Sequence, residues 1–372
     1  MRIAVLANTT WYLFNFRLNL MRALMTAGYE VVAIGPDDAY VEKLRVAGIR
    51  HASIPLVGAS INPLREMQTV WALYRLFKKE GVDLVLSYTP KGNIYGALAA
   101  AMVGIPTVAN VSGLGRVFIR RSPLTWLVQG LYRWIFRRAF RVFFQNREDM
   151  NMFLALGLVP PDKAERIPGS GVDVMHFLPK EEGGENDERG LVFLLVARML
   201  WDKGVGEYVE AARSLKSQYP AARFCLLGFV GVENPSAIPL ETIQTWEKEG
   251  IVEYLGHTDD VIAILRLADC VVLPSYREGV PRTLLEAASM AMPVITTDAP
   301  GCRDTVDDGV TGFLCQPKDA MDLANKMERM LNLPVGARRE MGRKGREKML
   351  REFDERIVIE HYLKVVALVG EA

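Results

Sequence analysis

The sequence is poor in cysteine and histidine and contains no long hydrophobic run. Its four cysteines among 372 residues form no Cys-x-x-Cys pair and have no zinc-ligand spacing, so we expect reduced thiols and neither a disulfide framework nor a structural zinc site. No stretch of about 18 uninterrupted apolar residues occurs, which excludes a membrane-spanning helix. The four histidines, which we interpret as structural or surface residues, are His51, His176, His257 and His361.

The charged residues nearly cancel over the whole chain, with a formal net charge of +1, but not within its halves. Residues 1–170 contain 21 Lys and Arg and 11 Asp and Glu, whereas residues 171–372 contain 24 and 33, so the two parts carry net charges of +10 and −9. The basic N-terminal part indicates an anionic partner, for which a membrane surface, a nucleic acid and a phosphorylated ligand are the candidates.

Short apolar segments alternate with amphipathic segments along the chain. Strands are predicted at 2–7, 30–35, 83–87, 107–111 and 141–145 with helices between them, and a second alternation begins at 191–197. An irregular segment is predicted at 8–15, between the first strand and the first helix. Strands separated by helices favour parallel sheets with helices on both faces. We therefore predict an α/β protein with two doubly wound, Rossmann-like domains that face each other across a cleft, with ligands beyond the carboxyl ends of the strands.

The length of the chain is that of two domains of about 150–200 residues each. The acidic, glycine-containing stretch 180–190 has no hydrophobic period and is typical of a linker. The predicted boundaries are 1–170 for the first domain, 171–190 for a hinge and linker, and 191–350 for the second domain. Residues 351–372 are predicted to form a C-terminal helix, for which a return to the N-terminal domain is one option.

The segment from Pro274 to Ala287 combines a strand end, a loop and a helix start. Gly279 lets a ligand approach the backbone closely, and Pro281 suits the first turn of a helix, where its missing N–H costs nothing. The N–H groups of residues 280–284 then form a helix N-terminus, which attracts anions. Glu278 and Glu286 flank this N-terminus, and their spacing lets two carboxylates hold hydroxyl groups on two parts of one nucleotide-sugar.

A second cluster follows the first strand of the C-terminal half. Arg198 offers two parallel N–H bonds to phosphate oxygens, and Lys203 offers a compact positive charge. Together they are suited to neutralise a diphosphate leaving group. A turn that contains Gly171 and Asp173 lies at the expected junction of the two domains.

These segments, taken in order, resemble the retaining glycosyltransferases of family 4, which have the two-domain GT-B architecture. Glu278 and Glu286 correspond to the E-x7-E signature of that family, Arg198 and Lys203 to its diphosphate-binding pair, and 171–173 to its interdomain motif. The resemblance covers essentially the whole chain.

Three segments, 14–17, 112–115 and 198–204, are similar to the bacterial branch of the family that extends sugars on undecaprenyl diphosphate. In that branch a UDP-N-acetylhexosamine is a frequent donor.

The resemblance implies roles for individual residues, with the acceptor in the N-terminal domain and the nucleotide-sugar in the C-terminal domain. Glu278 is expected near the hydroxyls of the transferred sugar and Glu286 on the ribose, and the expected catalytic residues are Glu278, Arg198 and Lys203. The expected donor site comprises Arg198, Lys203, Glu278, Gly279, Val280, Pro281, Thr283, Leu284 and Glu286. The expected cleft residues of the N-terminal domain are Asn8, Thr9, Thr10, Arg17, Ser112 and Gly113.

Three absences shape the expected chemistry. The sequence has no Asp-x-Asp, the metal motif of the other major glycosyltransferase architecture, so we expect no metal or other cofactor, with cationic side chains and helix N–H groups stabilising the departing UDP. Many family members carry a histidine near the sugar, but the matching segment 110–116 has none, and backbone amides of 112–115 are the expected substitute. Segment 8–15 lacks the carboxylate that a double displacement needs. The resemblance implies same-face attack by the acceptor hydroxyl, with the leaving phosphate accepting its proton.

The segment between Arg116 and Arg147 contains eight arginines, eight aromatic residues and no acidic residue. On a helix over 123–139, the expected buried stripe consists of Leu124, Leu127, Val128, Leu131 and Ile135, and the opposite face carries Trp126, Arg133 and Arg137. Tryptophan beside arginine indicates a membrane interface. A helix that packs within its domain is the alternative, and no nucleic-acid motif occurs.

We therefore predict a retaining, metal-independent hexosyltransferase that moves a hexose or N-acetylhexosamine from a UDP-sugar to a polyprenyl-diphosphate-linked saccharide, in the assembly of bacterial surface or glycoprotein glycans. The expected partners are the UDP-sugar, the lipid-linked glycan and an anionic membrane surface, without nucleic acid. The expected location is cytoplasmic, at the inner face of the cytoplasmic membrane. The alternatives are a soluble family member with a non-lipid acceptor, a GT-B sugar-nucleotide epimerase, and a regulator that binds nucleotide-sugars without catalysis.

Overall fold

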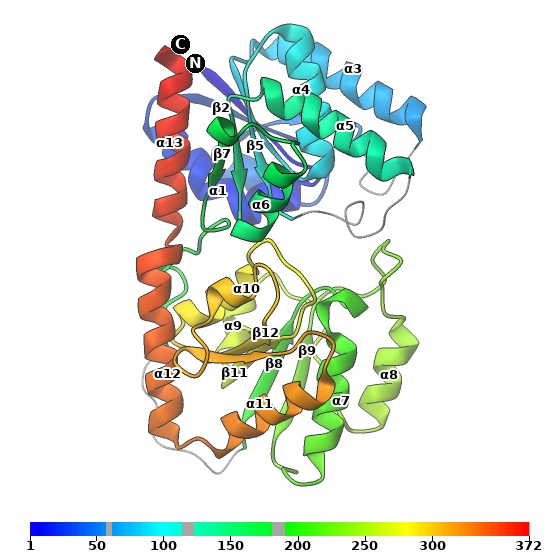
Figure 1. Ribbon diagram of the computed structural model, residues 1–372, viewed down its shortest axis with the longest axis vertical. Coiled ribbons are helices and arrows are strands. Elements are labelled where there is room, and N and C mark those ends of the chain that lie inside the picture. Colours follow the sequence, from blue (N-terminus) through cyan, green and yellow to red (C-terminus); the bar gives the residue numbers. More distant parts are fainter. Residues whose placement is uncertain (57–61, 114–122, 181–189, 372) are drawn as a thin grey trace. The chain divides into compact units, whose positions relative to one another are not determined.

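The computed structural model describes residues 1–56, 62–113, 123–180 and 190–371 (Figure 1). The chain divides into two compact units, the first comprising Met1–Ser170 with Ile357–Ala372 and the second Gly171–Arg356. Of the expected linker, residues 181–189 lie outside the described residues. The end of the chain belongs to the first unit, although it follows the second unit in sequence.

The first unit contains a parallel sheet of seven strands in the order β3-β2-β1-β4-β5-β6-β7. The strands are β1 (Arg2–Leu6), β2 (Glu30–Gly35), β3 (Arg50–Ser53), β4 (Leu84–Tyr88), β5 (Thr107–Val111), β6 (Arg141–Phe144) and β7 (Ala164–Arg166). The strand order reverses between β1 and β4, and in doubly wound sheets ligands bind beyond the carboxyl ends of the strands near such a point.

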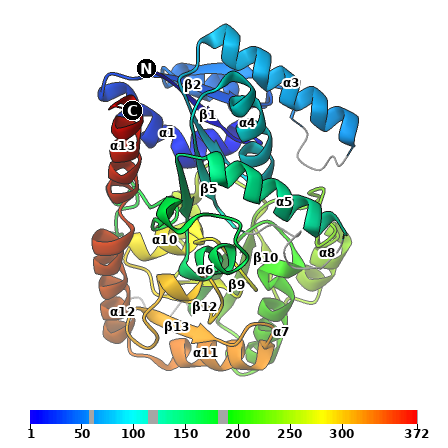
Figure 2. The same ribbon diagram turned by 45° about the horizontal axis from the view of Figure 1, so that its top comes forward.

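Helices cover both faces of this sheet (Figure 2). They are α1 (Thr10–Thr26), α2 (Val41–Val46), α3 (Pro63–Glu80), α4 (Pro90–Val103), α5 (Pro123–Arg138), α6 (Arg147–Ala155) and α13 (Glu355–Glu371). Apolar side chains of α3 and α4 pack on one face, and α5 and α6 continue that layer. Helices α1, α2 and α13 cover the opposite face.

Helix α1 begins at Thr10, although the sequence predicted an irregular segment up to residue 15. The hydroxyl of Thr9 accepts a hydrogen bond from the N–H of Tyr12 at 3.1 Å. The Oδ2 atom of Asp38 accepts the N–H groups of Thr10 at 2.8 Å and Trp11 at 3.0 Å. These acceptors satisfy the first N–H groups of the helix, which explains its early start.

Helix α13 is fixed to the first unit by polar and aromatic contacts. The hydroxyl of Tyr362 accepts a hydrogen bond from Nδ2 of Asn110 at 3.0 Å, and its ring meets the ring of Phe143 edge to face at 4.8 Å. Beside it, Nδ1 of His361 lies 2.6 Å from Oε1 of Glu165. Asn110 and Tyr362 are both buried, so α13 forms part of the core of this unit.

The second unit contains a parallel sheet of six strands in the order β10-β9-β8-β11-β12-β13. The strands are β8 (Val192–Val196), β9 (Arg223–Leu227), β10 (Glu253–Tyr254), β11 (Cys270–Leu273), β12 (Val294–Thr297) and β13 (Gly312–Cys315). Its helices are α7 (Val205–Lys216), α8 (Leu240–Lys248), α9 (Val261–Leu265), α10 (Arg282–Ser289), α11 (Ala320–Asn332) and α12 (Val335–Lys348). The strand order reverses between β8 and β11.

The start and the end of the second unit pair with each other. The N–H of Val172 donates to the carbonyl of Phe353 at 2.8 Å, and the N–H of Glu355 donates to the carbonyl of Val172 at 3.0 Å. Gly171 has φ of +69°, and a Cβ atom there would lie 2.4 Å from the Cα of Glu355. This close approach requires glycine.

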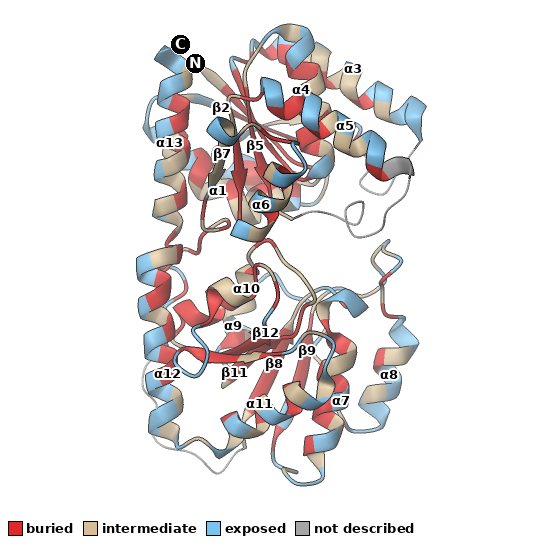
Figure 3. Cartoon of the chain, viewed as in Figure 1, coloured by how far each residue is buried: buried red, intermediate tan, exposed pale blue. Residues whose placement is uncertain are grey.

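The strands of each sheet are largely buried, whereas most helices bury one side only (Figure 3). This pattern follows from apolar runs in the strands and from amphipathic helices that cover both sheet faces. The prediction of two doubly wound α/β units is confirmed. Strands β3, β7 and β13 were not predicted from the sequence.

Candidate active site

In the second unit, the loops that follow β8 and β11 meet at the carboxyl edge of the sheet. The two strands are neighbours, with Phe193 of β8 opposite Cys270 of β11. A Cβ atom on Gly204, which has φ of +72°, would lie 2.1 Å from the carbonyl oxygen of Pro274. The glycine after Lys203 therefore brings the two loops into contact at the point where the strand order reverses, which is the usual ligand position in such sheets.

This contact brings Lys203 and Glu278 together. The Nζ atom of Lys203 forms an ion pair with Oε1 of Glu278, and the two side chains are only 20% and 15% exposed. The hydroxyl of Ser275 donates to the same carboxylate oxygen at 2.7 Å. The carbonyl of Ser275 in turn accepts the hydroxyl of Thr297 on β12, so Ser275 is held in place from a third strand. The Lys203 cation and the Ser275 hydroxyl thus both help to orient Glu278.

Helix α10 starts directly after this loop. Pro281 precedes the helix, and Leu284 donates the first hydrogen bond, to the carbonyl of Pro281 at 3.1 Å. The N–H groups of Arg282 and Thr283 thus lie in the first turn, where a helix attracts anions. Among the residues expected at the donor, the side chain of Leu284 is buried in the core, so any contribution from this residue comes from its backbone.

The loop before α10 is held by the segment after β12. The N–H of Glu278 donates to the carbonyl of Pro300 at 3.0 Å. Gly301 has φ of +78°, and a Cβ atom there would lie 2.2 Å from the carbonyl of Gly279. Gly279 is buried, and the next residue, Val280, is partly exposed at the start of the helix turn.

Glu286 lies on α10, one turn after Arg282. Its Oε1 atom accepts a hydrogen bond from Nε of Arg282 at 2.9 Å. Burial raises the pKa of the Glu286 carboxyl above its usual range, although Arg282 and His176 act in the opposite direction. A carboxyl group of this kind is suited to accept hydrogen bonds from neutral hydroxyl groups.

The second predicted cation, Arg198, differs from Lys203. It follows β8 and is exposed, and the next residue, Met199, donates its N–H to the carbonyl of Phe229 at 2.9 Å. Within the described part of the chain, the guanidinium of Arg198 makes no hydrogen bond or ion pair with protein. Arg198 is therefore available to an anionic ligand, whereas Lys203 already binds Glu278.

The predicted cleft residues of the first unit lie near the carboxyl ends of β1 and β5, with one exception. Asn8, Ser112 and Gly113 are partly exposed there. Thr9 caps α1, and Thr10 is buried, with its hydroxyl donating to the carbonyl of Pro36 at 2.6 Å.

The exception is Arg17, for which the expected place in the cleft is wrong. Its side chain is only 1% exposed, and Nη2 donates to the hydroxyls of Tyr12 at 2.9 Å and Ser170 at 3.0 Å. The guanidinium also lies over the ring of Tyr88 at 4.2 Å. These contacts hold the Nη2 end of Arg17 and one face of its guanidinium inside the unit, so we assign Arg17 to the interior.

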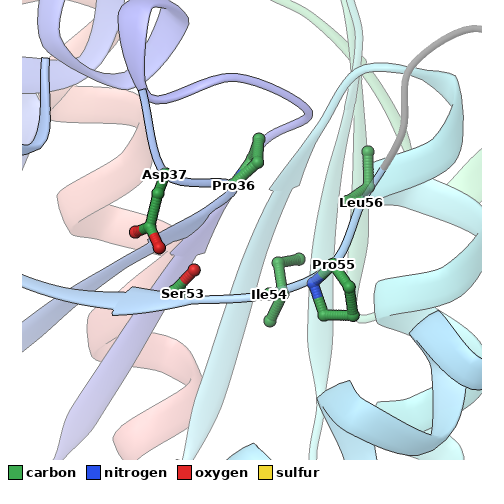
Figure 4. Close-up of a pocket in the computed structure, with 6 residues that line it drawn as sticks. All are labelled: Pro36, Asp37, Ser53, Ile54, Pro55 and Leu56. Carbon is green, nitrogen blue, oxygen red and sulfur yellow. The ribbon is translucent and has the colours of Figure 1, made fainter. Parts of the chain in front are cut away.

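A pocket lies at the carboxyl ends of β2 and β3 in the first unit (Figure 4). It is lined by Pro36, Asp37, Ser53, Ile54, Pro55 and Leu56. Nδ1 of His51 lies 3.8 Å from Oδ1 of Asp37, and Nε2 lies 3.5 Å from the hydroxyl of Thr10. None of the predicted cleft residues lines this pocket, because Asn8 follows β1, and Ser112 and Gly113 follow β5.

The basic aromatic helix, α5, packs differently from the prediction. Its buried side chains include Tyr132 and Phe136, whose rings meet the ring of Phe153 at 5.5 and 6.0 Å. The expected buried stripe is wrong at Leu127, which is 61% exposed, because these aromatic contacts turn the neighbouring face inwards. Residues 114–122 and the side chain of Leu124 lie outside the described residues.

Of the three residues predicted at a membrane, Trp126 and Arg137 are exposed. Arg133 is also exposed, but its guanidinium donates to the carbonyls of Leu156 and Gly157 at 3.0 and 3.1 Å. Arg133 thus satisfies carbonyls at the end of α6. Among the described residues, no helix is long and apolar enough to cross a bilayer, and no three His, Cys, Asp or Glu side chains gather as ligands for a metal ion.

Sequence reasoning missed two residues that shape these sites. Ser275 belongs to the segment from Pro274 to Ala287, and its position directly after Pro274 at a strand end was the available signal. Asp38, which accepts the N–H groups at the start of α1, follows β2 and gave no such signal.

Two protein families match the chain. The glycosyl transferase 4-like domain matches residues 16–169, and the glycosyl transferases group 1 match residues 179–348. An N,N'-diacetylbacillosaminyl-diphospho-undecaprenol alpha-1,3-N-acetylgalactosaminyltransferase from Campylobacter jejuni is 31% identical, with 98% of each chain covered. A UDP-Gal:alpha-D-GlcNAc-diphosphoundecaprenol alpha-1,3-galactosyltransferase from Escherichia coli is 28% identical over 80% of this chain and 77% of the relative.

Among solved structures, Anabaena HepE in complex with UDP-glucose superposes with a TM-score of 0.78 at 18% identity, covering 100% of both chains. At this identity the likeness shows the fold alone. Fold and matches together define a glycosyltransferase of GT-B architecture. The chain belongs to family 4 of these enzymes, as the sequence motifs predicted.

Proposed function

We propose that this enzyme transfers a hexose or N-acetylhexosamine from a UDP-sugar to a polyprenyl-diphosphate-linked saccharide. The observation that carries the donor half is the cluster of Lys203, Ser275 and Glu278 at the reversal of strand order, beside the N-terminus of α10. Arg198 lies on the same loop as Lys203 and is available to a diphosphate. Cations, helix N–H groups and two carboxylates match the phosphates and hydroxyls of a nucleotide-sugar.

We assign the roles within the donor site from this geometry and from the family motif. Glu286 accepts hydrogen bonds from the hydroxyls of the ribose, and Glu278 accepts hydrogen bonds from the hydroxyls of the transferred sugar. Arg198, Lys203 and the first N–H groups of α10 stabilise the charge that develops on the departing UDP, without a metal ion. The acceptor hydroxyl attacks from the face that UDP leaves, its proton passes to the leaving phosphate, and the anomeric configuration is retained.

The acceptor half is supported by the relatives and by charge. Both relatives named above are transferases whose names specify undecaprenyl-diphosphate-linked sugars. Residues 1–170 carry a net charge of +10, which suits a diphosphate-linked acceptor and an anionic membrane surface. We propose that the enzyme associates peripherally with the inner face of the cytoplasmic membrane, with Trp126 and Arg137 of α5 as contacts.

Incubation of the purified enzyme with a panel of nucleotide-sugars and lipid-linked acceptors tests this function. We expect one UDP-sugar to be consumed only when a polyprenyl-diphosphate saccharide is present. NMR of the product should show that the new glycosidic bond has the same anomeric configuration as the sugar in the donor. The Lys203→Met variant should lose this transfer, because it lacks the cation that faces the diphosphate.

The two alternatives give different products. Equal transfer to a free saccharide would identify a soluble enzyme with a non-lipid acceptor. Isomerisation of the UDP-sugar without any acceptor would identify an epimerase. Either result would overturn the proposed function.

A further inference from the structure

The outward face of α3 exposes three large apolar side chains among its polar residues. Leu64, Met67 and Trp71 are 71%, 69% and 47% exposed. Their spacing of three and four residues places them on one side of the helix, opposite the buried Leu73 and Phe77. Figure 3 shows the outer turns of α3 in pale blue. The solvent side of a surface helix usually carries polar residues, so three exposed apolar side chains on that side call for a partner.

The charges on this side of α3 are all positive. Arg75, Lys78 and Lys79 are exposed along the same face, and Arg65 lies at its margin. The two acidic residues of the helix turn towards the rest of the unit and are paired there. Oε1 of Glu66 lies 2.9 Å from Nζ of Lys91, and Oε2 of Glu80 lies 2.6 Å from Nη2 of Arg50.

Aromatic rings and cations are joined on this face. The rings of Trp71 and Tyr74 stack at 4.9 Å. The guanidinium of Arg75 lies 5.4 Å from the centre of the Trp71 ring, and Nζ of Lys78 lies 5.3 Å from that of Tyr74. Apolar side chains, an interfacial tryptophan and flanking cations together are the signature of a helix that lies in the headgroup region of a bilayer.

The position of α3 fits this interpretation. Helices α3 and α5 both pack against α4 and begin after parallel strands, so both start near the carboxyl edge of the same sheet (Figure 2). Asn8 and Ser112 lie at that edge. A membrane that contacts the start of α3 would therefore hold a lipid-linked substrate near the acceptor residues of this unit.

We propose that the α3 face, defined as Leu64, Met67, Trp71, Arg75 and Lys78, binds the headgroup region of an anionic membrane. A second copy of this chain is the other possible occupant, but two such faces would bring like charges together, which disfavours pairing. The inference rests on the proposed function only for the identity of the substrate that the membrane carries. Binding to vesicles can be measured without any transfer.

The first experiment compares two triple variants in sedimentation with vesicles of phosphatidylglycerol and phosphatidylcholine in equal amounts. One variant carries Leu64→Gln, Met67→Gln and Trp71→Gln, which keeps helix-forming residues in α3. The matched control replaces three exposed apolar residues on other elements by glutamine: Val46, Met102 and Met321. We expect the α3 variant to lose at least tenfold in vesicle affinity and the control to keep that of the wild type.

The second experiment separates charge from apolar contact. Each cation near an anionic leaflet contributes about fivefold in affinity, so Arg75→Gln with Lys78→Gln should lower affinity by about 25-fold for the mixed vesicles and little for pure phosphatidylcholine. Equal sedimentation of the wild type and both α3 variants would overturn the inference. Loss of a dimer in light scattering, with unchanged vesicle binding, would assign the α3 face to self-association instead.

A third measurement keeps this inference distinct from the proposed function. The α3 variant should transfer sugar to a short-chain, water-soluble polyprenyl-diphosphate saccharide at the rate of the wild type, and more slowly to an acceptor embedded in the mixed vesicles. If the wild type transfers to neither acceptor, the proposed function fails, while the vesicle binding of α3 is still decided by sedimentation. If the variant is equally slow with both acceptors, α3 acts on the fold or the site and the membrane assignment is wrong.

Discussion

Replacing Glu278 and Glu286 by glutamine, one at a time, should separate binding of the nucleotide from transfer of the sugar. The two carboxylates lie on either side of the start of α10 but have different partners. Glu278 binds Lys203 and Ser275, whereas Glu286 binds Arg282 of its own helix. Glutamine keeps the size of each side chain and removes its charge.

Glu286→Gln should weaken the binding of UDP itself. In the proposed site this carboxylate accepts hydrogen bonds from the hydroxyls of the ribose. The ribose is part of UDP as well as of the intact donor. Hydrogen bonds to charged groups contribute about 1.5–3 kcal/mol, which corresponds to about 10- to 100-fold in the dissociation constant. Turnover at saturating donor should change much less, because the ribose contact is the same before and during the reaction.

Glu278→Gln should leave UDP binding unchanged or tighten it, while turnover falls. In the wild type the negative charge of Glu278 offsets that of Lys203, which faces the diphosphate in the proposed site. Without it, Lys203 attracts the diphosphate more strongly. Two unit charges at about 4 Å interact by about 4 kcal/mol at an effective dielectric constant of 20, and screening leaves about 1 kcal/mol, or about fivefold. Loss of the sugar contact should lower turnover by about 100-fold or more.

Calorimetric titration of UDP into each variant, followed by kcat and KM for the donor, measures both effects. Glu241→Gln, an exposed glutamate in the first turn of α8, is the matched control and should behave as the wild type. An equal loss of UDP affinity in the Glu278 and Glu286 variants would refute the assignment of roles. So would weaker UDP binding in the Glu278 variant than in the Glu286 variant.

Four further outcomes are expected. Transfer should persist in EDTA, since Arg198, Lys203 and the helix N–H groups supply the charge stabilisation, and complete loss restored by Mg²⁺ or Mn²⁺ would contradict this. Because the pKa of Glu286 is raised, UDP affinity should fall with decreasing pH earlier than for an ordinary glutamate, and Glu286→Gln should retain only the pH dependence of the ligand phosphate. Because its pKa is raised, the Glu286 carboxyl of the folded state keeps its proton at pH values where the unfolded chain has released it, so its contribution to the free energy of unfolding falls as pH rises through that range. Calorimetric unfolding should therefore show that the Glu286→Gln variant is more stable than the wild type at neutral pH. Ser275→Ala should lower kcat about tenfold with little change in UDP affinity, because it frees the Glu278 carboxylate to rotate, and Ser275→Thr should restore part of the rate.

The central strands of both sheets were predictable because they are buried on both sides. Such strands contain continuous apolar runs, as in 270–273 and 84–86, and the helices between them have a clear period. The missed strands β3, β7 and β13 are three or four residues long, and β3 and β7 carry polar sequences, Arg50–Ser53 and Ala164–Arg166. Strands at a sheet edge are paired on one side only, so the apolar pattern that reveals a central strand is weak or absent there.

The errors on the two helices of the first unit have a common cause. The start of α1 depends on Asp38, whose carboxylate arrives from the end of another strand, and the buried face of α5 depends on Phe153 of α6. The burial of Arg17 likewise depends on Tyr88 and Ser170, far along the chain. The sequence of one helix shows which of its residues are apolar. Which face is buried depends on residues of other segments that contact the helix.

The same limit applies to the donor site, where the motif residues were found but not their pairing. Lys203 and Glu278 are 75 positions apart, and nothing in either motif shows that the cation binds the carboxylate. Their contact follows from the topology: the chain builds β8, β9 and β10 outward, returns, and places β11 on the other side of β8. Only this return brings the loops after β8 and β11 together, with Gly204 allowing the approach to Pro274. The reversal in strand order that creates a place for the ligand thus also brings Glu278 to Lys203, so the negative charge of the carboxylate partly offsets the cation that the ligand meets.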